Sequence, residues 1–193
     1  PSLLKITGRD LLVTTTPGEE VLSLSAGYPD RFGAQFSDYR IATLAEFADL
    51  LALWPDARAF VEIKHASIRA FGIDRVIDII LATLSDVQAQ CTLISFEYMA
   101  LQHVRDCSSL PIGWVLPAWN DDNRELAQAL APDYLFVNQK RLPPSESLWP
   151  GTWQWVTYTI NAPEDIVPCL ERGFSMVETN VIRSLLAGTP TDV

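Results

Sequence analysis

The chain has 193 residues, the length of one ordinary domain; 48% of them are hydrophobic and 20% are charged. Its formal net charge of −10 argues against a nucleic acid or an anionic membrane as the main partner, because both bind basic surfaces. A small phosphorylated molecule remains compatible with this charge, since one lysine or one bound cation can hold a phosphate locally. We therefore expect a single domain over residues 1–193 with no nucleic-acid partner.

Cysteine usage and hydropathy give a weak indication of the compartment. Cys91, Cys107 and Cys169 are far apart in the sequence and form no CxxC pair, so we interpret them as buried free thiols. Free thiols are typical of a reducing compartment, which favours the cytoplasm. No apolar run approaches the roughly 18 residues of a membrane span, so no stable membrane anchor is expected.

The first 40 residues have no strong hydrophobic period, and we expect loops with short extended pieces there. Regular structure begins at Thr43, where Thr43 and Glu46 form the pattern of a capping box. Apolar residues then recur at helical spacing from Leu44 to Trp54, and Pro55 ends this predicted helix.

From there, predicted strands alternate with predicted helices. The strands cover 58–64, 91–96, 111–116, 134–138, 153–160 and 174–179. The helices cover 73–87, 98–106, 122–131, 162–172 (with a kink expected at Pro168) and 182–186. Short apolar strands that are each followed by a helix indicate parallel βα units.

Two α/β architectures fit this alternation. An open doubly wound sheet would often carry a glycine-rich phosphate loop, and no GxGxxG or GxxxxGK is present. The other is a TIM-type (β/α)8 barrel, of which about six of the eight strands are present. We favour the barrel and expect its first two strands to precede Pro1.

The strongest candidate site residues are Glu62 and Lys64, at the end of the first predicted strand. Side chains alternate along a strand, so these two share one face, whereas Val61 and Ile63 point to the other. The pair can be an internal salt bridge or a site in which the carboxylate binds a hard cation and the ammonium binds a phosphate. Spacing alone does not decide between the two.

Other candidates are weaker. Ser95 and Phe96 end the second strand, where they can contact a ligand or serve ordinary packing. Asn161 has the position of a helix N-cap. Neither histidine, His65 or His103, stands in a position that indicates an acid or a base, and His103 is expected on a helix surface.

Seven segments support a more specific interpretation when they are taken in order. They are 1–8, 41–47, 60–64 (Phe-Val-Glu-Ile-Lys), 94–97 (Ile-Ser-Phe-Glu), 110–113, 158–165 and 173–180. In order and spacing they resemble the glycerophosphodiester phosphodiesterase family, and they span essentially the whole chain. That resemblance implies a (β/α)8 barrel that is incomplete at its N-terminus, because the family's HRG, ExD and HD motifs are absent from this sequence.

The resemblance also implies roles for single residues. Glu62 corresponds to a carboxylate ligand of a divalent cation, Mg²⁺ or Ca²⁺, and Lys64 to a phosphate contact. Phe96 and Tyr158 correspond to walls of the substrate pocket, although Tyr158 stands where the family usually has Trp. Asn180 likewise stands where the family usually has Asp.

The activity implied is that of a phosphoric diester hydrolase of glycerol and lipid metabolism, which converts a small-molecule glycerophosphodiester into glycerol 3-phosphate and an alcohol. One histidine would act as base and another as acid, both upstream of Pro1, so we expect this chain alone to be inactive.

Two other functions remain open. One is a non-catalytic barrel that acts as a ligand- or partner-binding module. The other is a related phosphodiesterase of sphingolipids or inositol phospholipids, which would favour an apolar lid or a basic interfacial patch. A six-stranded partial barrel has two open edges, which predicts a tendency to self-associate.

Overall fold

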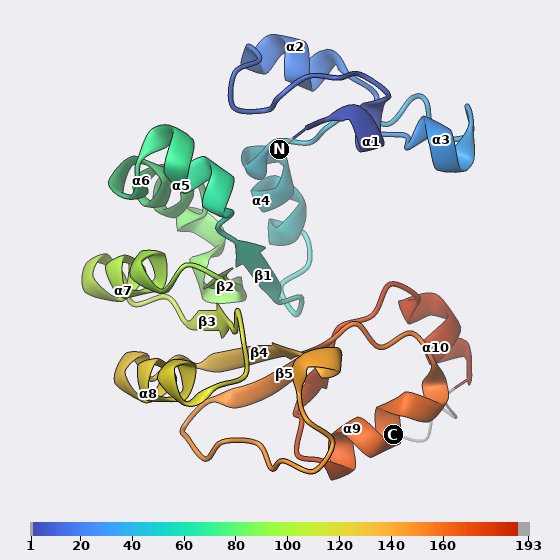
Figure 1. The fold of residues 1–193 in the computed structure, drawn as a ribbon. Helices are drawn as coiled ribbons and strands as arrows, with labels where there is room; N and C mark the ends of the chain where they lie inside the picture. Colours follow the sequence, from blue (N-terminus) through green and yellow to red (C-terminus); the bar gives the residue numbers. More distant parts are fainter. Residues whose placement is uncertain (1, 189–193) are drawn as a thin grey trace. The chain divides into compact units, whose positions relative to one another are not determined.

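The computed structural model describes residues 2–188 and divides the chain into two compact units (Figure 1). The first comprises Pro1–Ala59 and Lys64–Cys91, and we call it the helical unit. The second comprises Phe60–Ile63 and Thr92–Val193, and we call it the sheet unit. Whether residues 1–193 behave as one domain stays a prediction.

The helical unit differs from expectation near its start. Three short helices occupy the segment predicted as loop, and its extended pieces reduce to two single-pair bridges, Ser2 with Leu12 and Ser25 with Arg40. Helices of four to six residues are too short to show a hydrophobic period, which explains the error. The helices of this unit are α1 (Leu4–Thr7), α2 (Gly18–Ser23), α3 (Pro29–Phe32), α4 (Leu44–Ala52), α5 (His65–Phe71), α6 (Ile73–Thr83) and the 3₁₀-helix η1 (Ser85–Gln90).

The predicted capping box at α4 is confirmed. The backbone N–H of Glu46 donates to Thr43 Oγ1 over 3.1 Å, and the backbone N–H of Thr43 donates to Glu46 Oε2 over 2.7 Å. The hydrogen bond from the Thr43 backbone lowers the pKa of Glu46. At the other end of α4, Gln90 Nε2 donates to the carbonyls of Leu51, Trp54 and Ala57, which joins the end of η1 to the end of α4 and the turn after it.

The long helix predicted over 73–87 is shorter than expected. Helix α6 ends at Thr83, and the chain continues as η1, in which Val87 stays buried. The apolar spacing runs through both helices, because a 3₁₀ turn keeps i and i+3 on one side as an α-helix does. Helix α5 was not predicted; Gly72, which adopts a left-handed φ of 83°, separates it from α6.

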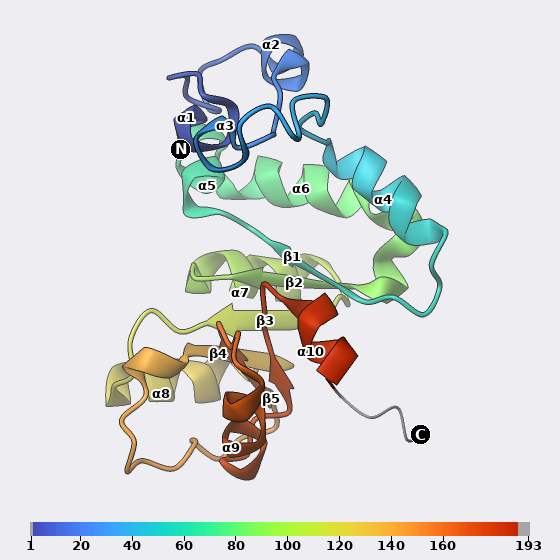
Figure 2. The ribbon, with the colours of Figure 1, turned by 90° about the vertical axis from the view of Figure 1, so that its right-hand side faces the viewer.

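The sheet unit contains the six predicted strands, apart from the first residues of β1 and β2. The strands are β1 (Ala59–Glu62), β2 (Cys91–Ser95), β3 (Ile112–Val115), β4 (Tyr134–Asn138), β5 (Gln154–Tyr158) and β6 (Met176–Val177). Their order in the sheet is their order in the chain, and β2 to β6 pair in parallel with each neighbour (Figures 1 and 2). Strand β1 joins the sheet beside β2, where the Ile63 N–H donates to the Ile94 carbonyl over 2.8 Å.

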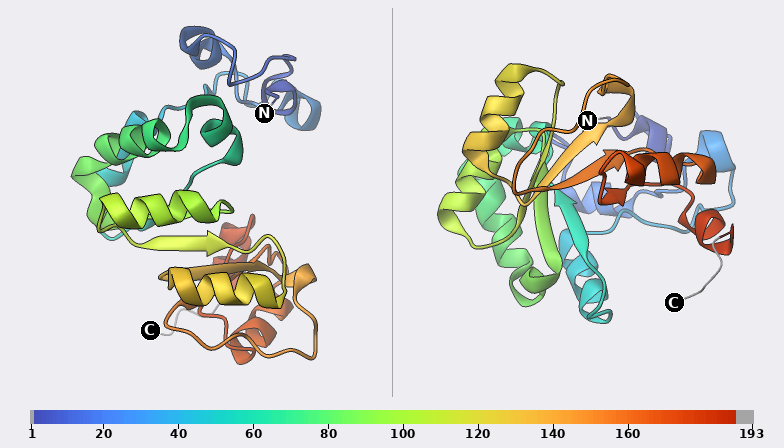
Figure 3. Two further views of the ribbon diagram at one scale, coloured as in Figure 1. Left: turned by 60° about the vertical axis from the view of Figure 1, so that its left-hand side comes forward. Right: turned by 90° about the horizontal axis from the view of Figure 1, so that it is seen from below.

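Helices follow the strands of this unit, as the prediction of parallel βα units requires. They are α7 (Tyr98–Cys107), α8 (Asp121–Leu130), η2 (Gln139–Arg141), η3 (Pro163–Asp165), α9 (Ile166–Glu171) and α10 (Ile182–Gly188). Helices α7 and α8 lie along one side of the strands β2 to β4 (Figures 1 and 3). The helix predicted over 162–172 is divided into η3 and α9, so that Pro168 falls in the first turn of α9, where a proline is tolerated without a kink.

The inner side of the sheet carries an apolar cluster. Val115, Phe136 and Val156 are its buried members. Gly113 lies close to this cluster: a β-carbon there would come within 2.8 Å of both Ile94 Cγ2 and Phe136 Cε2. The strands are therefore packed on both sides, as parallel sheets are.

The described cysteines and helices bear on two further predictions. Cys91 and Cys169 are buried free thiols as predicted, and burial raises the pKa of each, but Cys107 is exposed. No helix within residues 2–188 combines the length and apolar character that crossing a membrane requires.

Candidate active site

Parallel strands place their carboxyl ends at one edge of a sheet, and that edge is where α/β proteins carry their sites. Glu62 is the last residue of β1, and Glu178 directly follows β6. A cavity of about 370 Å³, here called the acidic pocket, is lined by Phe60, Glu62, Ile94, Phe136, Val156, Met176, Val177 and Glu178. The sheet therefore curves enough for its first and last strands to line one pocket.

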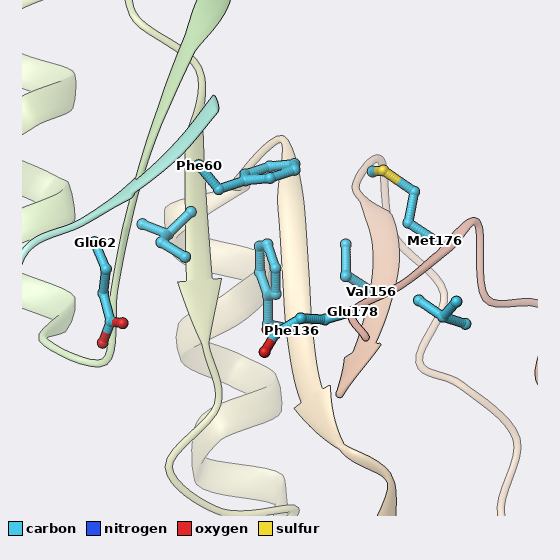
Figure 4. A pocket seen from close by; sticks show the side chains of 8 residues that line it. Phe60, Glu62, Phe136, Val156, Met176 and Glu178 are labelled. Carbon is cyan, nitrogen blue, oxygen red and sulfur yellow. The ribbon is translucent and has the colours of Figure 1, made fainter. Parts of the chain in front are cut away.

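The acidic pocket has an apolar body and a charged end. In Figure 4, Phe60 and Met176 lie at the top of the view, and the Glu62 and Glu178 side chains lie below them, on the side to which the strand arrowheads point. The rings of Phe60 and Phe136 meet edge to face with centroids 5.3 Å apart. Apolar walls lower the local dielectric constant, which strengthens the attraction of carboxylates for a cation.

The hydroxyl of Tyr158 is influenced both by carboxylates of this pocket and by a guanidinium group. It is the last residue of β5 and is half-buried. Burial raises the pKa of its hydroxyl; the guanidinium of Arg141 opposes this, whereas the carboxylates of Glu178 and Glu62 raise the pKa further. The phenol is therefore neutral near pH 7 and can donate a hydrogen bond.

A second, polar cavity of about 270 Å³, here called the basic pocket, lies at the ends of β4 and β5. It is lined by Asn138, Gln139, Lys140, Tyr158, Thr159 and Asn161. Lys140 is the charged member of this lining. Tyr158 lines the basic pocket and packs against the apolar cluster of Val115, Phe136 and Val156, of which Phe136 and Val156 line the acidic pocket.

Of the four predicted site residues, two line a pocket in the structure and two do not. Glu62 lines the acidic pocket and Tyr158 the basic pocket. Phe96 is 39% exposed and is not among the residues that line either pocket; its carbonyl accepts a hydrogen bond from Trp114 Nε1. Lys64 is exposed in the helical unit, at the N-cap of α5, and chain geometry keeps its Cα within about 7 Å of that of Glu62.

Two polar residues at strand ends have structural contacts. Ser95 is fully buried; its hydroxyl donates to the Ile63 carbonyl over 2.8 Å and accepts from the Glu97 N–H over 3.0 Å, so it joins the ends of β1 and β2. The N-cap prediction for Asn161 is wrong: its Oδ1 accepts from the Asn180 N–H over 2.9 Å and from Thr179 Oγ1 over 3.2 Å. Asn161 thus joins the chain beyond β5 to the chain beyond β6.

Sequence reasoning missed several residues that line the pockets, and three of them carry polar or charged groups that matter for the site: Glu178, Asn138 and Lys140. Glu178 belongs to a predicted strand and could have been found by the strand-end rule that selected Glu62. Asn138 ends the predicted strand 134–138 and Lys140 follows it, so both could have been found in the same way. The histidines gave no such signal: His65 is exposed, His103 is half-buried on α7, and neither is among the residues that line the two pockets.

The acidic pocket offers part of a metal site. Glu62 and Glu178 present hard carboxylate oxygens, and Mg²⁺ is commonly held by one or two carboxylates together with water and substrate phosphate. Within residues 2–188, no three His, Cys, Asp or Glu side chains lie close enough together to hold an ion by themselves. The donor set fits a cation that completes its coordination with water and a phosphate.

Comparison with known proteins identifies the fold. The structure of an Oleispira antarctica phosphodiesterase in complex with the product sn-glycerol-3-phosphate matches with a TM-score of 0.79 and 17% identity, over 96% of this chain and 75% of that one. Glycerophosphodiester phosphodiesterases from Agrobacterium tumefaciens (TM-score 0.68, 11% identity, 96% and 78% covered) and Thermotoga maritima (0.64, 16%, 96% and 75%) match as well. The chain has the fold of the glycerophosphodiester phosphodiesterases.

The match confirms the predicted partial TIM-type barrel and the structural resemblance to this family. No family model matches the sequence. A search of curated proteins also gives no match.

Proposed function

We propose that this chain provides part of a metal-dependent phosphodiesterase that hydrolyses glycerophosphodiesters to glycerol 3-phosphate and an alcohol. The observation that carries the proposal is the position of Glu62: a carboxylate at the carboxyl end of a barrel strand, facing an apolar cavity, in the fold of enzymes of this activity. One of those structures holds sn-glycerol-3-phosphate, the product expected of the reaction.

In this proposal Glu62 is a ligand of a divalent cation, Mg²⁺ or Ca²⁺, in the pocket that Glu178 also lines. When bound, the cation would neutralise charge on the phosphate. Lys64 contacts a phosphate oxygen, which the short chain distance to Glu62 supports, and Tyr158 and Phe96 form walls around the substrate. Tyr158, neutral near pH 7, can donate its hydroxyl proton to a hydrogen bond without giving it up.

The proposal assigns no proton transfer to a histidine of this chain, since neither lines the acidic pocket. The 193 residues alone are therefore expected to bind cation and product without turnover. Release of glycerol 3-phosphate that is lost in Glu62→Gln would establish the activity and overturn the assignment that these residues lack the acid and the base.

Calorimetry tests the site directly. Titration of Mg²⁺ or Ca²⁺ in the presence of glycerol 3-phosphate should show tighter cation binding than without it, because the phosphate completes the coordination. Glu62→Gln should weaken cation binding by at least tenfold, and the matched variant Glu125→Gln, an exposed carboxylate on α8, should bind as the parent does. Unchanged cation binding in Glu62→Gln would contradict the proposal.

The absence of a histidine from the acidic pocket also favours the second candidate, a non-catalytic barrel that binds a ligand or a partner. The same titrations separate the two functions. Glycerol 3-phosphate binding that is equal in EDTA and in Mg²⁺, and equal in Glu62→Gln, would support the binding module and contradict the hydrolase.

A further inference from the structure

The basic pocket has an unusual charge for this protein. The chain carries a net charge of −10, yet the six residues that line the pocket include a lysine and no carboxylate. Arg141, next to Lys140, lies near enough to Tyr158 to lower the pKa of its hydroxyl. The basic pocket therefore presents positive charge, whereas the acidic pocket presents two carboxylates.

Hydrogen bonds fix the orientation of the two asparagine amides in this pocket. The backbone N–H of Lys140 donates to Asn138 Oδ1 over 2.9 Å, and the backbone N–H of Asn180 donates to Asn161 Oδ1 over 2.9 Å. A backbone N–H can only donate, so the amide oxygen must face it and the amide cannot be flipped. Both oxygens are thus used within the protein.

The remaining atoms of these amides are donors. Within residues 2–188, the Nδ2 groups of Asn138 and Asn161 have no acceptor. Lys140 adds an ammonium group with three donors, and Tyr158 adds a neutral hydroxyl. A pocket rich in donors, positive, and with its amide oxygens occupied complements an oxyanion.

The size of the pocket limits what the anion can be. About 270 Å³ lies just below the usual range of pockets that bury a whole ligand, roughly 300–1,000 Å³, so there is room for one compact group. Tyr158 lines this pocket and packs against the apolar cluster of Val115, Phe136 and Val156. Phe136 and Val156 also line the acidic pocket, so a group bound here lies near a phosphodiester bound at Glu62.

We propose that the basic pocket is a subsite for a compact oxyanion, a carboxylate or a phosphate group, carried by the alcohol half of the substrate. In naming the carrier, this inference rests on the proposed function. Its consequence is selectivity: the enzyme binds glycerophosphodiesters with an anionic group on the alcohol in preference to those without one. Free inorganic phosphate has the same chemistry and is the other source of such a group.

The first experiment tests the anion site apart from the metal site. Inorganic phosphate is titrated in EDTA and followed by NMR chemical shifts. Lys140→Gln should lower the affinity at least tenfold, Lys140→Arg should retain it, and Lys5→Gln, the same charge change at an exposed lysine of the helical unit, should have no effect. Circular dichroism verifies that each variant is folded.

Two results would overturn the subsite. One is equal phosphate affinity in Lys140→Gln and the parent. The other is loss of phosphate binding in Glu62→Gln under the same conditions, which would place the anion in the acidic pocket and leave the proposed hydrolase intact. Binding that persists in Glu62→Gln and is lost in Lys140→Gln supports the subsite whether or not the hydrolase proposal holds.

The second experiment separates the two sources of the anion. Glycerophosphoserine and glycerophosphoethanolamine differ by one carboxylate, and both are titrated in the presence of Mg²⁺. The serine compound should bind at least tenfold more tightly, and Lys140→Gln should abolish the difference. Equal affinity of the two diesters for the parent protein would overturn the head-group assignment.

Discussion

The acidic and basic pockets occur on one curved sheet, yet they are built in different ways. The acidic pocket is made by residues of the strands: apolar side chains form its body, Glu62 ends β1, and Glu178 directly follows β6. The basic pocket is made by side-chain hydrogen bonds at the end of β4 and beyond the end of β5, where Asn138 and Asn161 accept from backbone N–H groups. A strand-end rule therefore selects side chains of both pockets, whereas the hydrogen bond that orients Asn161 joins segments that are far apart in the sequence.

The largest expected effect is a loss of stability when one wall of the acidic pocket, Phe136, is removed. Phe136 is 4% exposed and contacts Phe60 across the acidic pocket. Phe136→Ala should lower the free energy of unfolding by about 3–5 kcal/mol, because it removes a large buried side chain. Urea denaturation measures this, with the 39% exposed Phe96→Ala as the matched control, for which a much smaller loss is expected. Equal losses in both variants would contradict the packing described.

A smaller effect is expected at the junction that holds β1 in the sheet. Ser95→Ala removes the hydroxyl that donates to the Ile63 carbonyl and accepts from the Glu97 N–H. Leaving these buried groups without that partner should cost about 1–3 kcal/mol, whereas Ser145→Ala at an exposed position should change the stability by less than about 0.5 kcal/mol. Because β1 carries Glu62, Ser95→Ala should also weaken cation binding while leaving phosphate binding in EDTA unchanged. Loss of phosphate binding instead would show that the pockets are not separate.

The smallest expected effect concerns Tyr158, which lines the basic pocket. Its pKa in the folded protein is raised, mainly by burial, so above pH 10 the unfolded chain loses this proton more readily than the folded chain does. Tyrosine ionisation at this position therefore lowers stability as the pH rises from about 10 through the folded-state pKa. Urea denaturation between pH 9 and 11 should show a shallower decline for Tyr158→Phe than for the parent. The same decline in both proteins would contradict the raised pKa.

Much of the fold followed from the sequence because its signals are local. The run Tyr-Leu-Phe-Val-Asn at 134–138 is the observed β4, and Thr43 with Glu46 forms the predicted capping box. Helix α5 and the short helices before residue 40 have too few turns to show a period. The error at Asn161 has another cause, since its partners at 179 and 180 are close only after β5 and β6 have paired.

The candidate site, like the fold, was predictable where its signals are local in the sequence. Strand alternation and the family resemblance selected Glu62, and the structure places it in a pocket. The approach of Glu178 to that pocket depends on the curvature of the sheet, which brings together the first and last strands and is not a property of either segment alone. The opposite charges of the two pockets likewise appear only after folding.

The central claim is that the acidic pocket holds a divalent cation at Glu62. Anomalous diffraction at the manganese edge, from crystals of this chain grown with Mn²⁺ and glycerol 3-phosphate, tests it most directly. We expect an anomalous peak beside the Glu62 carboxylate, in the pocket that Phe60 and Phe136 line, with the phosphate of the product as a neighbour. A bound product with no manganese at Glu62, or manganese only at carboxylates outside this pocket, would contradict the account.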